Sequence, residues 1–207
     1  MKIGITYQPQ LKTKPMQTLW KDITNKLNAI APQITEVLLP GVTETEVKDL
    51  EERLQIKLPN NFIDFYKIHN GQDDATPWMI DGELLLSFEE IYNQWSIWDD
   101  LQRNKHFETD NGEPFESDPE KGIKNVWWNS KWIPFTYDGS GNHLCLDLDP
   151  DSGGNYGQVI RMWHDDSNRL LLAKSFTDWV KDYTKQLQNG NLVNSEDYFA
   201  IINKQDA

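Results

Sequence analysis

The chain lacks the features by which secreted and membrane proteins are usually identified. Its 207 residues contain one cysteine, Cys145, so no internal disulfide can form, which suits a reducing compartment. The opening residues Met1–Gln8 lack the continuous apolar stretch of a signal peptide, and no later segment approaches the length needed to span a bilayer. We therefore expect a cytoplasmic protein.

Basic residues are scarce relative to acidic ones. The chain has 20 lysines and arginines against 33 aspartates and glutamates, a formal net charge of -13 at pH 7. Like charge repels the phosphate backbone and anionic lipids, so we expect neither nucleic acid nor a membrane as a partner. This charge favours encounter with basic macromolecules, although solubility alone is the commoner reason for it.

Large apolar side chains are plentiful, by contrast. Hydrophobic residues make up 38% of the chain and aromatic residues 12%, including nine tryptophans, so burial can offset the entropy of an ordered chain. The length is that of one domain, and there is no internal repeat or low-complexity linker. We expect a single domain over residues 1–190 and a short C-terminal tail over residues 191–207.

Helical periodicity and capping residues dominate the first part of the chain and return near its end. A capping box pairs Thr43 with Glu46, and Ser87 and Ser175 are placed to cap two further helices. The expected helices cover residues 16–30, a segment after Thr43, residues 62–68, a segment after Ser87, and residues 176–189.

A period of two, typical of strands, replaces the helical period after residue 130. Strands are expected at residues 132–135, 143–148, 158–163 and 169–173, with a shorter one at 83–86. Their connections are short turn sequences, which indicates an antiparallel meander. Residues 103–125 show no sustained period, so we expect a long loop there. The predicted fold class is α+β, with N-terminal helices and a C-terminal helix packed on a mostly antiparallel sheet.

One acidic segment resembles the start of a calcium loop. Asp147, Asp149 and Asp151 alternate as oxygen ligands would, but Ser152 stands where the loop requires glycine, and Gln158 where it requires a closing glutamate. We interpret this segment as an ordinary hairpin turn.

Metal and nucleophile chemistry have similarly weak support. His143, Cys145 and His164 could converge on a metal, but no close ligand pair accompanies the solitary cysteine. The turn Asp138–Asn142 lacks the first glycine of a G-x-S-x-G nucleophile motif. We expect no catalytic residue, no metal site and no cofactor.

Four separated segments agree in type and order with one family, from about Leu11 to Leu187. The chain resembles the SUKH superfamily, which includes a fungal cell-wall-assembly regulator and many bacterial immunity proteins. The segments are Leu58–Tyr66 leading to His69–Gly71, Trp132–Phe135 with Asp138–Asn142, Leu144–Pro150, and Ala173–Trp179.

The resemblance implies a binding protein and not an enzyme. Its first implication is an immunity protein that neutralises a toxin, often a nuclease with a basic groove that an acidic inhibitor could occupy. The alternative is a regulatory scaffold for cell-wall or envelope synthesis. The rival hypothesis from the enzyme class is a hydrolase that uses surface carboxylates.

The contact face for such a partner is expected around the turn Asp138–Asn142. Trp127, Trp128 and Trp132 flank a loop and could be partly exposed, and Trp132 would serve as an aromatic anchor. The predicted partner-binding residues are Trp132, Asp138, Asn142, Asp99, Asp100, Glu113, Glu116 and Asp118.

Overall fold

A computed structural model describes residues 15–207. The segment on which the signal-peptide expectation rests, and the start of the resemblance at Leu11, lie outside the described residues. The helices are α1 (Met16–Ile30), α2 (Pro32–Glu36), α3 (Glu44–Leu54), α4 (Asn60–Tyr66), α5 (Phe88–Arg103) and α6 (Phe176–Asn189). The strands are β1 (Leu38–Pro40), β2 (His69–Gln72), β3 (Leu84–Leu85), β4 (Asp118–Pro119), β5 (Trp132–Pro134), β6 (Thr136–Tyr137), β7 (His143–Asp147), β8 (Gln158–Met162), β9 (Asn168–Ala173), β10 (Leu192–Ser195) and β11 (Ala200–Asn203).

The main sheet has five strands in the order β4-β9-β8-β7-β5. All its pairings are antiparallel except that of β4 with β9, which is parallel. Three two-stranded pairs accompany it: β1 with β2, β3 with β6, and β10 with β11. The predicted α+β class and the mostly antiparallel sheet are confirmed.

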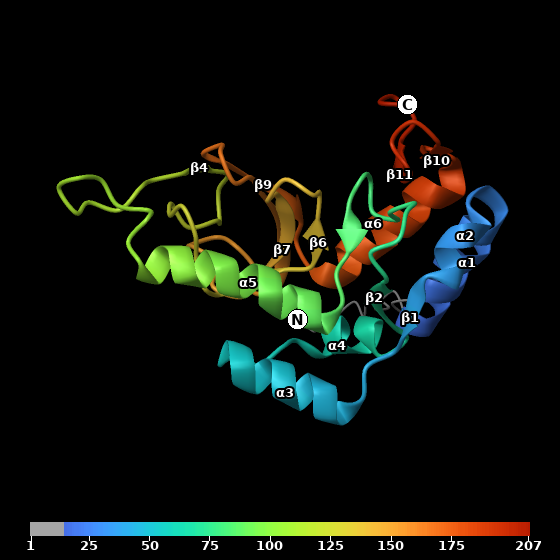
Figure 1. Cartoon of the computed structure of the whole chain (residues 1–207), viewed down its shortest axis with the longest axis horizontal. Helices are drawn as coiled ribbons and strands as arrows, with labels where there is room; N and C mark the ends of the chain where they lie inside the picture. Colours follow the sequence, from blue (N-terminus) through green and yellow to red (C-terminus); the bar gives the residue numbers. More distant parts are fainter. Residues whose placement is uncertain (1–14) are drawn as a thin grey trace, which may run out of the picture.

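Helices cover both faces of this sheet, which explains why β7 is buried along its whole length. Side chains alternate between the two faces of a strand. His143 of β7 contacts Trp98 of α5, whereas its neighbour Leu144 shares a cleft with Trp179 of α6. The sheet therefore lies between α5 on one face and α6 on the other, with α1 and α4 packed against α6 (Figure 1).

Three helices, α3, α5 and α6, begin directly after a residue whose side chain caps them. Thr43 Oγ1 accepts from the backbone N–H of Glu46 (3.3 Å), and the Glu46 carboxylate accepts from that of Thr43 (2.7 Å). Ser87 and Ser175 cap α5 and α6, and α6 ends at Gly190, as the sequence predicts. Within residues 15–207, no helix has both the length and the apolar character needed to cross a membrane.

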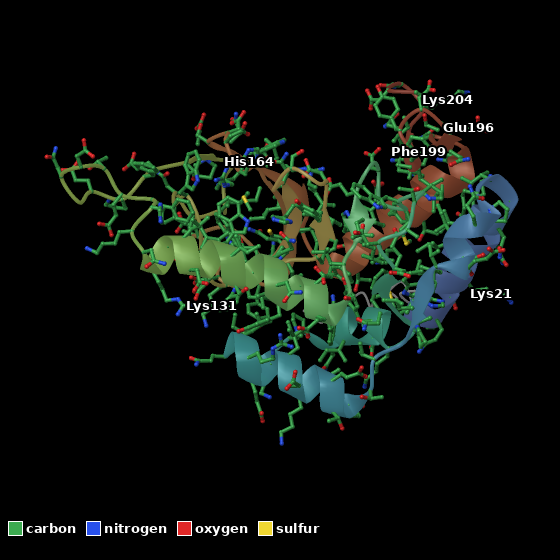
Figure 2. All side chains as sticks on the ribbon, viewed as in Figure 1. Lys21, Lys131, His164, Glu196, Phe199 and Lys204 are labelled. Atoms are coloured by element: carbon green, nitrogen blue, oxygen red, sulfur yellow. The ribbon has the colours of Figure 1, made fainter. Side chains whose placement is uncertain are left out.

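The last residues form a hairpin and not a loose tail. Strands β10 and β11 pair in register, and Trp78 exchanges backbone hydrogen bonds with Phe199 (3.0 Å) and Ile201 (2.8 Å). Figure 2 shows Glu196, Phe199 and Lys204 together at the outer end of this hairpin. The segment is short and has little period of its own, so its role in the core depends on distant contacts. Its buried members are Leu192, Ala200, Ile201 and Ile202.

Candidate partner-binding surfaces

The most acidic surface follows from the last turn of α5 and the loop after it, residues 99–120, here called the acidic end. This segment has eight acidic residues against two basic ones, a net charge of -6 out of the chain's -13. Its loop extends away from the body of the molecule (Figure 1). The structure brings five of the sequence-predicted contact residues to this end: Asp99, Asp100, Glu113, Glu116 and Asp118.

Aromatic packing and backbone hydrogen bonds hold the loop of the acidic end in place. The ring of Phe107 stacks on Trp98, with centroids 5.6 Å apart, and the N–H of Phe115 donates to the carbonyl of Phe107 (2.7 Å). The ring of Phe115 in turn meets Trp127 edge-on at 6.0 Å. The long loop expected from the sequence is thus present, but it is anchored to the tryptophans beneath it.

Arg169 contacts Trp127, one of the tryptophans on which the loop packs. Its side chain is fully buried and donates only to backbone carbonyls, those of Asp166 (2.6 Å), Asn168 (2.7 Å) and Trp127 (2.8 Å). Its guanidinium also lies 5.2 Å from the centre of the Trp127 ring. Burial lowers the pKa of Arg169 to about 10, so the side chain remains a cation at neutral pH.

The carboxylates of the acidic end differ in the contacts they make. Asp99 and Asp100 both pair with Arg103, at 2.8 and 2.5 Å, and Glu108 pairs with Lys105 at 3.5 Å. Of the other five, Glu120 accepts a hydrogen bond from the backbone N–H of Leu171 (2.7 Å), and four are exposed and form neither an ion pair nor a side-chain hydrogen bond with any residue of the described range 15–207. These four are Asp110, Glu113, Glu116 and Asp118.

Asp138 and Asn142 are used to shape their own turn. The Asp138 carboxylate accepts from the backbone N–H groups of Ser140 (2.8 Å) and Asn142 (3.0 Å) and from the Asn142 side chain (2.6 Å). Burial opposes ionisation of Asp138, but these hydrogen bonds outweigh it and lower its pKa. Gly139 and Gly141 adopt φ angles of 86° and 106°, which the turn requires. The structure therefore gives these two polar side chains a structural role.

Trp132 cannot be an exposed aromatic anchor, and this prediction is wrong. Its side chain is 0% exposed because β5 lies beneath α5, and it meets the ring of Trp128 edge-on at 6.1 Å. The sequence suggested partial exposure for Trp127, Trp128 and Trp132. Trp128 is also buried, and Trp127 alone of the three is half-buried. Proximity to a loop did not reveal which of these rings a helix covers.

The candidate metal ligands of the sequence make contacts within the fold. Asp147 accepts from Gln158 (2.8 Å) and from the backbone N–H of Asp149 (2.9 Å), and burial raises its pKa. Cys145 is buried, which raises the pKa of its thiol. His164 contacts Asn142 at the surface (3.0 Å). Within residues 15–207, no three His, Cys, Asp or Glu side chains are grouped to hold a metal ion.

Sequence reasoning missed a cleft beside α6, here called the α6 cleft. It has a volume of about 290 Å³ and lies between α6, strands β8 and β9, and the C-terminal hairpin. In its wall, the buried Glu83 carboxylate forms an ion pair with Arg161 and accepts from the hydroxyl of Thr136. Burial raises the pKa of Glu83, and the charge of Arg161 opposes that shift. No local spacing signals this pair, because its members are far apart in the sequence.

The structure thus defines an α+β domain with helices on both faces of a mostly antiparallel sheet, an acidic end and a small lateral cleft. The model of the SMI1 / KNR4 family (SUKH-1) matches residues 41–182. The chain belongs to this family, which confirms the resemblance. The match includes the acidic end, whereas α1 and the C-terminal hairpin lie outside it.

Curated relatives of this chain are fungal regulators. The chain is 23% identical to "Cell wall assembly regulator SMI1" of Saccharomyces cerevisiae, over 87% of this chain and 43% of the relative. It is 27% identical to "Cell wall biosynthesis/cell cycle regulator smi1" of Schizosaccharomyces pombe, over 88% and 38% respectively. It is 23% identical to "Glucan synthesis regulatory protein" of Neurospora crassa, over 86% and 39%. The chain spans less than half the length of these relatives.

Proposed function

We propose that this chain is a non-catalytic binding domain that regulates cell-wall or envelope assembly by holding a basic partner protein against its acidic end. The names of the fungal relatives describe regulators, and they favour this function over toxin neutralisation, for which the comparisons offer no support. The cytoplasmic location and the exclusion of nucleic acid and membrane stay predictions from composition.

The observation that carries the proposal is the set of four exposed carboxylates on the acidic end that have neither an ion-pair partner nor a side-chain hydrogen bond within residues 15–207. An acidic side chain already paired with arginine or lysine gains little from a second cation. Free carboxylates on an anchored loop can bind the lysines and arginines of a partner without first breaking an internal contact. Because they are exposed, their attraction is screened by salt.

The burial of three side chains that could take part in catalysis supports a non-catalytic role. His143, Cys145 and Asp147 are buried in β7, and the two polar ones among them are engaged in hydrogen bonds within the fold. A catalytic base must reach the proton it abstracts, which a fully enclosed side chain does not do.

The test is capture of the partner from native cells with the tagged full chain and with two charge variants. The first variant, D110N/E113Q/E116Q/D118N, removes the four free carboxylates. The matched control, D151N/E196Q/D197N/D206N, removes the same charge from exposed positions elsewhere. Glu196 lies at the end of the molecule opposite the acidic end (Figures 1 and 2).

We expect one basic protein of cell-wall or envelope synthesis to bind the chain and the control variant, and to be lost as salt rises. The acidic-end variant should bind it at least about fourfold more weakly, since each of four exposed ion pairs contributes about 0.2–1 kcal/mol. If both variants bind the partner equally well, the acidic end is not its binding surface. A captured toxin would instead favour the immunity function.

A further inference from the structure

The α6 cleft combines apolar walls with charged groups at its mouth. The ring of Trp179 stacks on that of Tyr183, with centroids 5.9 Å apart and planes 9° from parallel, and together they form one wall. Leu172 of β9 also lines the cleft and is 44% exposed. Such walls suit the aliphatic part of a long side chain.

The charges of the cleft do not cancel. Glu83 is neutralised by Arg161, so this pair contributes no net charge. Asp81 and Asp182 also line the cleft, and both are exposed. Neither carboxylate forms an ion pair with a residue in the described part of the chain, and Asp81 uses one oxygen to accept from the backbone N–H of Asn203 (2.8 Å). The mouth therefore carries two uncompensated negative charges.

The size of the cleft limits its occupant. Pockets for drug-sized ligands have volumes of roughly 300–1,000 Å³. The α6 cleft, at about 290 Å³, falls at the lower edge of this range and fits one side chain better than a larger ligand. Apolar walls leading to two carboxylates match an aliphatic stem that ends in a cation.

We propose that the α6 cleft receives one lysine or arginine side chain of a partner protein, with the stem between Leu172 and Trp179 and the cationic group at Asp81 and Asp182. This inference rests on the proposed function in that the partner is basic, but it concerns a different surface from the acidic end. The amide oxygens of Gln186 and Asn203 also line the cleft; they accept from the Asn191 side chain (2.6 Å) and from the backbone N–H of Gln205 (3.1 Å), and each has a second lone pair for the same cation.

A titration monitored by nuclear magnetic resonance tests this directly on the ¹⁵N-labelled full chain. The probe is N-acetyl-arginine amide, and its control is N-acetyl-citrulline amide, which has nearly the same shape but no charge. We expect the arginine probe to shift the indole signal of Trp179 and the side-chain amide signals of Gln186 and Asn203, with millimolar affinity. Shifts that lie elsewhere, or equal binding of citrulline, would overturn the proposal.

Two variants add a structural control. Asp182→Asn and Asp81→Asn each remove one charge while keeping the shape, and asparagine can still accept from Asn203. Each should weaken binding of the arginine probe by about two- to fivefold. Asp110→Asn, on the acidic end, should leave it unchanged; unchanged affinity in both cleft variants would refute the site.

The same variants separate this inference from the proposed function. In one outcome, the acidic-end variant loses the captured partner, Asp182→Asn captures it normally, and the arginine probe does not bind. This outcome would overturn the cleft proposal and leave the proposed regulatory function standing. In the other outcome, the arginine probe binds in the cleft but no basic partner is captured. This outcome would overturn the proposed regulatory function and leave the cleft proposal standing.

Discussion

The indole N–H of Trp98 in α5 donates a hydrogen bond to Nε2 of His143 in β7, at 3.2 Å. The other ring nitrogen, Nδ1, lies 2.7 Å from the carbonyl oxygen of Thr136, which can only accept. Nδ1 must therefore carry the proton and Nε2 must be the acceptor, so the imidazole is neutral. Burial lowers the pKa of His143 to about 4, and its neutral ring joins α5 to the sheet.

This arrangement predicts a loss of stability in mild acid. His143 must remain neutral in the folded chain, whereas in the unfolded chain its pKa returns to 6.5. The stabilisation is complete above pH 6.5 and is lost as the pH falls towards about 4, because the unfolded state then binds the extra proton. We expect a loss of about 3 kcal/mol in the free energy of unfolding, measured by urea denaturation across this range.

Other groups also titrate in this range, so the measurement needs a variant without the imidazole. His143→Gln keeps a side chain that can donate and accept, but removes the titration. The variant should be less stable at neutral pH and should lose less stability on acidification. The same pH dependence in both proteins would contradict the assignment to His143.

The Glu83–Arg161 pair predicts unequal costs for its two members. Arg161→Met leaves a carboxylate that is 3% exposed without its counter-charge, so we expect a loss of about 3–5 kcal/mol in unfolding free energy. Glu83→Gln should cost less, because glutamine can still accept from Thr136 and the Arg161 side chain, 20% exposed, can reach water. Thermal and urea unfolding of both variants measures the difference.

The double variant and pH provide the checks on this pair. Combining Glu83→Gln with Arg161→Met should cost less than the sum of the single changes, since the stranded charge is gone. Arg161→Met should regain stability as the pH falls, because protonation of Glu83, whose pKa burial already raises, removes that charge. An Arg161→Met variant as stable as the original would contradict the pairing.

The C-terminal hairpin predicts that the last residues belong to the folded core. Ile201 is 0% exposed, so Ile201→Ala should lower the free energy of unfolding by about 2–5 kcal/mol through lost burial and a residual cavity. Tyr198, at 63% exposed in the same hairpin, is the matched control, and Tyr198→Ser should change stability by less than about 0.5 kcal/mol. Equal stability of both variants would mean that residues 191–207 are a tail after all.

Elements defined by local interactions were predictable from the sequence. The first helix follows from apolar residues at helical spacing, and α3, α5 and α6 begin at Thr43, Ser87 and Ser175, whose side chains bond to amides three residues ahead. The main strands likewise follow from alternation and turn residues. These signals depend on neighbours in the chain, which the sequence displays directly.

The acidic end was partly predictable for the same reason. Its charge is a count of residues, and Glu113, Glu116 and Asp118 are exposed as expected. The aromatic contacts that anchor it were not predictable, because Phe115 and Trp127 meet only when the loop folds back onto the body. The family resemblance came from segments that keep their order along the chain.

By itself, then, the sequence determined the capped helices, the strands, the negative charge and the family, because each is recorded in residues close together or in their order. Only the tertiary structure decided that Trp132 is covered by a helix, that Glu83 meets Arg161, and that the last residues close a hairpin on the core. Each of these depends on which distant segments the packing of the sheet and helices brings into contact, and no local pattern encodes that.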